Sequence, residues 1–71
     1  MMCYFIYREE ETHKLKTLLS LNLECIPQQG NCIVFNRKSY TVKQVTLDAN
    51  HVNYVIKIER INKNVVELKP Q

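Results

Sequence analysis

Residues 27–47 read PQQGNCIVFNRKSYTVKQVTL, and this stretch carries the strongest fold signals because turn residues alternate with apolar segments. Pro27 presets its own φ near about −65°, the value that suits the second position of a turn. Gly30, the only glycine of the chain, lies three residues later, where a positive φ is often needed. Asn36–Ser39 is a polar break of hairpin length, and asparagine tolerates the left-handed region. The stretch therefore predicts a β-hairpin that is entered through a turn.

The two strands of this hairpin have different side-chain patterns. Cys32–Phe35 is apolar at every position, which predicts a short strand in the centre of a sheet with both faces covered. In the second strand Tyr40 and Val42 alternate, but the next apolar residue, Val45, is one position out of phase. A β-bulge at Lys43–Gln44 would return Val45 to the face of Val42 and bend the strand. The alternative is a regular strand in which Val45 faces the other side.

The first third of the chain contains one clear strand and one ambiguous segment. Tyr4–Tyr7 is aromatic and β-branched and predicts a first strand, and residues 8–14, REEETHK, form a charged break. The leucine spacing after that break fits a helical face, whereas Leu19–Cys25 alternates apolar and polar residues with a period of two. We favour a strand over Leu15–Cys25 that pairs back with the first strand, with a short helix or a turn around residues 9–20 as the alternative.

The last third adds two further strand signals. Asp48–His51 has the composition of a loop, and Val52–Glu59 then alternates apolar and polar residues as a long half-buried strand does. Residues 62–64 predict a turn, and Val65–Leu68 predicts a last short strand. Pro70 ends that strand, because proline cannot join the interior of a ladder.

Together these segments predict an all-β, mainly antiparallel fold: a meander of five to six short strands closed as a small SH3-like barrel or β-roll. A chain of 71 residues allows a single domain, 1–71, with a thin core. The residues expected in that core are Leu19, Leu21, Leu23, Phe35, Tyr40, Val42, Val45, Tyr54, Ile56 and Ile58.

Composition narrows the class of protein further. A hydrophobic fraction of 45% with one glycine and two prolines excludes a disordered composition. No run approaches the roughly 18 consecutive apolar residues of a membrane span. The apolar start lacks a basic region before it and leads into a run of acidic residues, which is not the pattern of a signal peptide. We therefore expect a cytoplasmic protein.

No catalytic, cofactor or metal motif is visible. The odd number of cysteines, three, with no CxxC spacing argues against a disulfide framework and a zinc site. Cys25 and Cys32 flank the turn at Gly30, and we expect both to be small buried hydrophobes. His13 and His51 fall in predicted loops beside acidic residues, without a second ligand cluster. We expect no enzyme activity and no cofactor or metal.

One resemblance is visible at the level of the fold. The spacing Pro-x-x-Gly-x-x-Ile-x-Phe-x-x-x-x-Tyr-x-Val-x-x-Val over residues 27–45 resembles a pattern of short bacterial and phage domains with SH3-like or related small β-barrels. The resemblance covers about a quarter of the chain and implies a fold, without catalytic residues. Many functions occur on such barrels, so it implies no particular function.

Two classes of function remain. The first is a non-enzymatic module that binds another protein chain, including a second copy of itself. Its contact strand would be the apolar Tyr4–Tyr7, because no proline or lysine protects the edge of this strand. The expected contact residues are Tyr4, Phe5 and Tyr7. The second is a nucleic-acid-binding barrel. Residues 36–71 carry seven basic and three acidic side chains, and the net charge of the chain is +3. This modest charge favours the first class. The basic residues available for phosphate contacts are Arg37, Lys38, Lys43, Lys57, Arg60 and Lys63.

Overall fold

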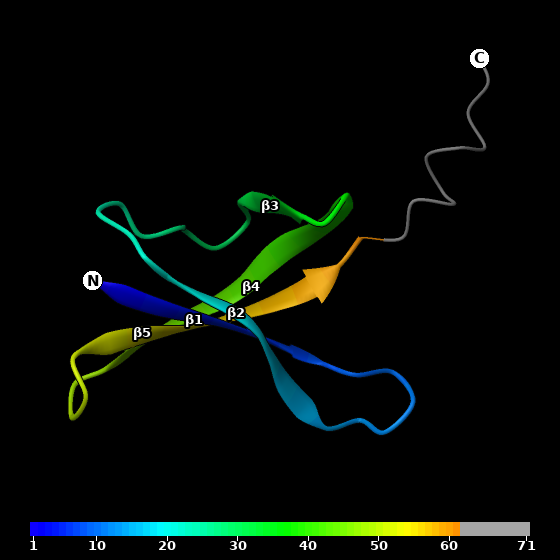
Figure 1. The fold of residues 1–71 in the computed structure, drawn as a ribbon, viewed down its shortest axis with the longest axis horizontal. Coiled ribbons are helices and arrows are strands. Elements are labelled where there is room, and N and C mark those ends of the chain that lie inside the picture. The colour runs from blue at the N-terminus through cyan, green and yellow to red at the C-terminus, as the bar shows by residue number, and fades with distance from the viewer. Residues whose placement is uncertain (62–71) are drawn as a thin grey trace, which may run out of the picture.

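The computed structural model describes residues 1–61, which form five β-strands and no helix (Figure 1). The strands lie side by side in one sheet in the order β2-β1-β5-β4-β3. The sheet curls into a half-barrel, so the prediction of an all-β, mainly antiparallel small-barrel fold is confirmed. The strand bounds are β1 Met2–Arg8, β2 Leu15–Asn22, β3 Cys32–Phe35, β4 Lys38–Asp48 and β5 Asn53–Arg60.

Two antiparallel units make up this sheet. β1 and β2 form a hairpin, and β3, β4 and β5 form a three-stranded meander. The units meet through a parallel pairing of β1 with β5, in which Phe5 lies opposite Ile56. The prediction of a single antiparallel meander is therefore wrong at this junction. The parallel contact joins the strands that carry Phe5 and Ile56, which are both almost completely buried.

The hairpin of β3 and β4 turns where the sequence predicts. Gly30 has a φ of 95°, and its N–H donates to the carbonyl of Val42 at 2.9 Å. Asn36 and Arg37 form a two-residue loop with φ values of 53° and 64°. Positive φ at both central residues is the mark of a type I′ turn, whose twist matches that of the flanking strands.

The placement of β3 in the centre of the sheet is not confirmed. Among residues 1–61, β3 pairs only with β4 and lies at one edge of the sheet. The core lines only one face of the half-barrel, so the apolar side chains of β3 are not all buried. Val34 is 68% exposed. Apolar side chains on both faces of a four-residue strand therefore did not indicate a central position.

The bulge in β4 is confirmed. The register with β5 shifts between Val42, which lies opposite Ile58, and Gln44, which lies opposite Lys57. Val42 is buried and Val45 packs against the same cluster. The extra residue is Lys43. Its side chain is exposed, so the bulge does not disturb the packing of the core.

The segment after the charged break is a strand and not a helix. β2 pairs with β1, as predicted, and a second register shift occurs at Leu18, between the pairs Phe5–Leu19 and Ile6–Thr17. The connecting loop is closed by the N–H of Glu9, which donates to the carbonyl of Lys14 at 2.9 Å. This loop contains a turn and no helix.

The core lies on the concave face of the half-barrel. Of the predicted core, Tyr40, Val42, Ile56 and Ile58 are buried, and all the others except Leu21 are partly buried against them. Leu21 is 42% exposed, because β2 is an edge strand. Two core residues outside the predicted set are Cys3 and Phe5, both on β1.

The predicted turn at 62–64, the strand at 65–68 and Pro70 lie outside the described residues. Within residues 1–61, no helix has the length and hydropathy needed to cross a membrane.

Candidate protein-interaction surfaces

The strand predicted to form the contact with another chain lies in the interior of the sheet. β1 pairs with β2 on one side and with β5 on the other, so the expected free edge at Tyr4–Tyr7 is a wrong prediction. Phe5 is 1% exposed and belongs to the core, Tyr4 is 37% exposed, and Tyr7 is half-buried. The first strand could not be recognised as central because its parallel partner, β5, lies some fifty residues further along the chain.

The two free edges of the described sheet belong to β2 and β3. β3 has four residues, whereas β2 has eight, so β2 offers the longer unpaired ladder. A free edge exposes backbone N–H and C=O groups that can pair with another strand.

The free groups of β2 follow from the hydrogen bonds at its two ends. The carbonyl of Lys14 accepts from Glu9, and the N–H of Leu23 donates to Met1, so both residues turn their backbone groups toward β1. Backbone groups alternate sides along a strand. The bulge at Leu18 shifts this alternation by one residue. Thr17, counted from Lys14, and Ser20, counted from Leu23, therefore both turn their backbone N–H and C=O groups toward solvent.

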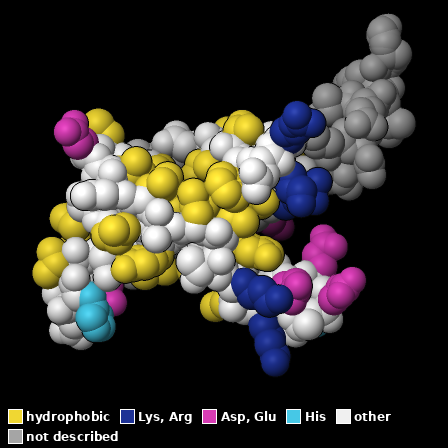
Figure 2. All heavy atoms as spheres, viewed as in Figure 1, with side chains coloured by type: hydrophobic (Ala, Val, Ile, Leu, Met, Phe, Trp, Pro, Cys, Tyr) yellow, Lys and Arg dark blue, Asp and Glu magenta, His cyan; other side chains and the backbone are white. Residues whose placement is uncertain are grey.

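The side chains of β2 do little to block this edge. Residues 17–23, TLLSLNL, contain no charged residue, no proline and no glycine. Native edge strands are commonly protected by lysine, proline or a very short length. Lys16 and Glu24 carry the nearest charges on either side. Figure 2 shows hydrophobic side chains gathered across the middle of the face that it presents.

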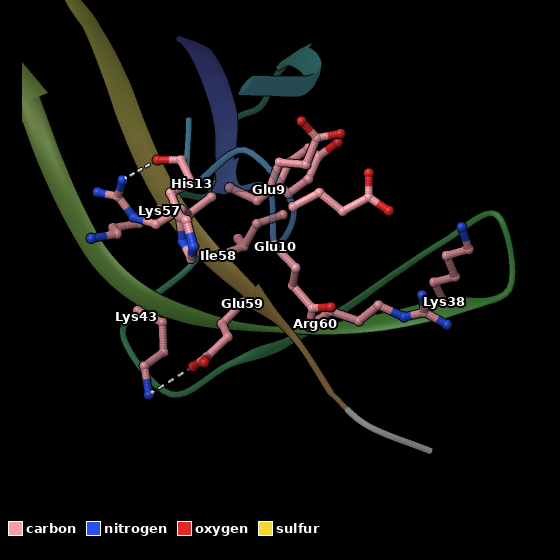
Figure 3. A pocket seen from close by; sticks show the side chains of 12 residues that line it. Glu9, Glu10, His13, Lys38, Lys43, Lys57, Ile58, Glu59 and Arg60 are labelled. Carbon is pink, nitrogen blue, oxygen red and sulfur yellow. Dashed lines mark hydrogen bonds and ion pairs between the residues drawn. The ribbon is translucent and has the colours of Figure 1, made fainter. Parts of the chain in front are cut away.

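A second surface is an open cleft where the two units of the sheet diverge. The pairing of β1 with β5 ends at Ile6 and Lys57, and the continuing ends of both strands then border a common space (Figure 3). Figure 2 shows charged side chains on both sides of this hollow. The cleft is lined by Tyr7, Arg8, Glu9, Glu10, Glu11, His13, Lys38, Lys43, Lys57, Ile58, Glu59 and Arg60.

Backbone groups of two arginines turn toward this cleft. The N–H of Glu9 faces β2, so by alternation Arg8 turns its N–H and C=O away from β2. The N–H of Ile61 donates to Ser39 on β4 at 2.8 Å, so Arg60 turns its backbone groups away from β4. The register of β1 with β5 does not extend to either arginine.

The cleft has charges of both signs. The loop between β1 and β2 contributes Glu9, Glu10 and Glu11, whereas β4 and β5 contribute most of the basic side chains. Two of its acidic residues are already engaged: Glu59 lies 3.5 Å from the Nζ of Lys43, and Glu9 lies 3.0 Å from the Nζ of Lys16. A hydrogen bond from Thr12 and the contact with Lys16 lower the pKa of Glu9. The same contact with Glu9 raises the pKa of Lys16.

Four of the six predicted phosphate-contacting residues share this cleft. They are Lys38, Lys43, Lys57 and Arg60. Arg37 lies in the type I′ turn and does not line the cleft, and Lys63 falls outside the described residues. No local pattern indicates that Arg8, His13 and the acidic loop border the same space, because that depends on where β1 and β5 separate.

The lining of the cleft does not resemble a small-molecule site. Such sites are concave, mostly apolar and typically about 300–1,000 Å³ in volume. This cleft is wide, at about 1120 Å³, and most of its lining residues are charged.

The cysteines and histidines form no centre for chemistry in the described part of the chain. Cys25 and Cys32 are free and exposed, so the prediction that both are buried is wrong; they lie on a surface loop and on an edge strand. Cys3 is buried, which raises the pKa of its thiol. His51 lies beside Asp48, with Nδ1 2.9 Å from the carboxylate, in an exposed turn. Within residues 1–61, no three His, Cys, Asp or Glu side chains are grouped to hold a metal ion.

Comparison with protein-family models gave no match, and comparisons with curated proteins and with solved structures gave no significant match either.

Proposed function

We propose that this chain is a non-enzymatic module that binds another polypeptide by adding a strand to the free edge of β2, including the β2 of a second copy. The observation that carries the proposal is this edge, which has eight residues, no partner strand within residues 1–61 and an uncharged centre. Strand addition supplies main-chain hydrogen bonds, and the side chains of the edge supply specificity.

The bulge in β2 supports a two-fold pairing of β2 with itself. In a regular strand, residues three positions apart turn their backbone groups to opposite sides. The register shift at Leu18 places the free groups of Thr17 and Ser20 on the same edge. An antiparallel pairing can then set Thr17 of one copy opposite Ser20 of the other, and the reverse, as a two-fold interface requires.

The small core supports the same proposal. Six buried side chains form the centre of the concave face, and Leu21 on β2 remains 42% exposed. A second copy would extend the sheet beside Leu21 and add buried apolar area without lengthening the chain.

Proline on the free edge tests the proposal. Ser20→Pro removes an N–H that faces solvent, so the fold is retained while strand addition is blocked. We expect sedimentation equilibrium at tens of micromolar to show a species heavier than the 8.4 kDa chain for the parent protein and the monomer for the variant. Ser20→Ala keeps the N–H and serves as the matched control.

Ser20→Lys gives a second variant in case proline disturbs the strand, because an edge lysine also discourages pairing. A parent protein that is monomeric throughout this range would contradict self-association. A dimer that persists in both variants would move the interface away from β2.

Nucleic-acid binding is the second candidate, and one observation favours it: four predicted basic residues share the cleft with Tyr7, a residue able to stack on a base. The glutamates of the same cleft oppose it. If phosphates bind there, the log of the affinity falls steeply with the log of the salt concentration. Titration of labelled oligonucleotides at several salt concentrations tests this candidate, and we expect weak binding.

A further inference from the structure

We propose that the cleft between β1 and β5 is a second binding site, which takes an extended acidic peptide segment of a partner protein. This site is separate from the free edge of β2, and the proposal does not require that edge to self-associate. The partner chain would lie along the end of β5, with acidic side chains directed at the basic residues of β4 and β5.

The first support is the backbone at the mouth of the cleft. β1 and β5 pair only as far as Ile6 and Lys57, and both strands continue beyond this point. Arg60 turns its N–H and C=O toward the space between them, as the alternation from the hydrogen bond of Ile61 requires. An extended chain is the ligand whose own backbone can pair with these groups.

The second support is the distribution of charge between the two sides. On the β4–β5 side, Lys38, Lys57 and Arg60 line the cleft without an ion pair among the described residues. Lys43 on the same side is already paired with Glu59. Three cations that have no ion pair within residues 1–61, beside the end of β5, favour acidic side chains in the ligand.

The third support comes from the opposite side, which restricts the ligand. Figure 3 shows Glu9 and Glu10 extending from the loop between β1 and β2, across from the strands that carry Lys38 and Arg60. A nucleic acid, with a phosphate at every residue, would bring charge against this loop as well as against the cations. A peptide can place acidic side chains on one side only, since successive side chains of an extended chain alternate.

The test uses a labelled peptide, acetyl-Asp-Val-Glu-Val-Asp-amide, in which acidic and β-branched residues alternate. Fluorescence anisotropy is measured with the full chain carrying Ser20→Pro, so that β2 is blocked and the result is independent of self-association. We expect saturable binding, little binding of the basic counterpart acetyl-Lys-Val-Arg-Val-Lys-amide, and weaker binding of an acidic peptide that is N-methylated at alternate residues.

Charge reversal locates the site. Lys38→Glu with Arg60→Glu should weaken the acidic peptide about tenfold, as expected for the loss of two exposed ion pairs. Lys14→Glu with Arg37→Glu changes the net charge equally at two residues outside the cleft lining and should have little effect. Far-UV circular dichroism confirms that both double variants remain folded.

Three results would overturn the proposal. Equal binding of the acidic and basic peptides would show that the cleft does not select charge. Unchanged affinity in the Lys38 and Arg60 double variant would place the site elsewhere. Tighter binding of a short oligonucleotide than of the acidic peptide, lost in the same variant, would assign the cleft to nucleic acid.

Discussion

At the scale of single residues, four non-glycine positions within residues 1–61 have positive φ: His13, Asn36, Arg37 and Val52. Asparagine tolerates this region because its short polar side chain can bond locally, whereas a β-branched residue there is an outlier. Val52 is thus the most strained of the four, and it lies in the turn between β4 and β5 with 65% of its surface exposed. The turn is held by Asp48, which accepts a hydrogen bond from the N–H of Asn50.

Val52→Asn should therefore stabilise the protein. Removing a β-branched residue from a φ of 53° relieves strain of roughly 1 kcal/mol, and little buried apolar surface is lost. The midpoint of urea unfolding measures the change. Val34→Asn is the matched control, because Val34 is similarly exposed but lies in a strand without a positive φ. An equal response of both variants would show that strain at residue 52 is not the cause.

Gly30→Ala, in contrast, should destabilise the protein. The φ of 95° disfavours any residue with a Cβ, although a Cβ placed there would meet no atom within 4 Å. The cost is therefore conformational, at about 1 kcal/mol or somewhat more. Gln29→Ala, in the same exposed turn, should have almost no effect on the unfolding midpoint. An unchanged midpoint in Gly30→Ala would show that the turn adapts without penalty.

At the scale of elements, local signals predicted most of the strands and the two hairpins, β1 with β2 and β3 with β4, but not the parallel pairing of β1 with β5. Alternation over 19–25 indicated a strand in β2, and the phase slip at Lys43 indicated the bulge in β4. Neither pattern contains information on which strand pairs with which. The parallel contact of β1 with β5 is non-local, and it decides that β1 is interior and that β2 and β3 are edges. The expected free edge at Tyr4–Tyr7 was wrong for this reason, while four basic residues of the predicted set do share a surface.

The loop between β1 and β2 should respond to acid. A hydrogen bond from Thr12 and the contact with Lys16 lower the pKa of Glu9, so this carboxylate is more acidic in the folded state than in the unfolded state. Its contribution to stability is present above the ordinary pKa of 4.5 and is lost as the pH falls through the lower folded value. The contact with His51 likewise lowers the pKa of Asp48, so the contribution of this carboxylate to stability is also lost as the pH falls.

Glu9→Gln should therefore make the free energy of unfolding less dependent on pH in the acidic range. The free energies of unfolding of the parent and the variant should differ most near neutral pH and converge as the pH falls through the lowered folded pKa of Glu9. Glu10→Gln removes an exposed carboxylate of the same loop that forms no ion pair within residues 1–61, and its profile should follow the parent. A constant difference between parent and Glu9→Gln across this range would contradict the proposed role of the carboxylate.

At the scale of the whole molecule, the half-barrel buries one face of a single sheet. The fully buried part consists of Cys3, Phe5, Val42 and Ile56, with two further buried side chains beside them. At about this chain length, apolar burial and the loss of chain entropy nearly cancel. Association would then contribute a large share of the stability, because a partner that binds only the folded state shifts the unfolding equilibrium by mass action.

The melting temperature should accordingly rise with protein concentration. If β2 pairs with the β2 of a second copy, dilution populates the folded monomer, which lacks the added ladder and unfolds at a lower temperature. Ser20→Pro should melt at the temperature that the parent approaches on dilution, with no dependence on concentration, whereas Ser20→Ala should follow the parent. Differential scanning fluorimetry over a hundredfold range of concentration measures this. A concentration dependence that Ser20→Pro retains would mean that association stabilises the fold through a surface other than the free edge of β2.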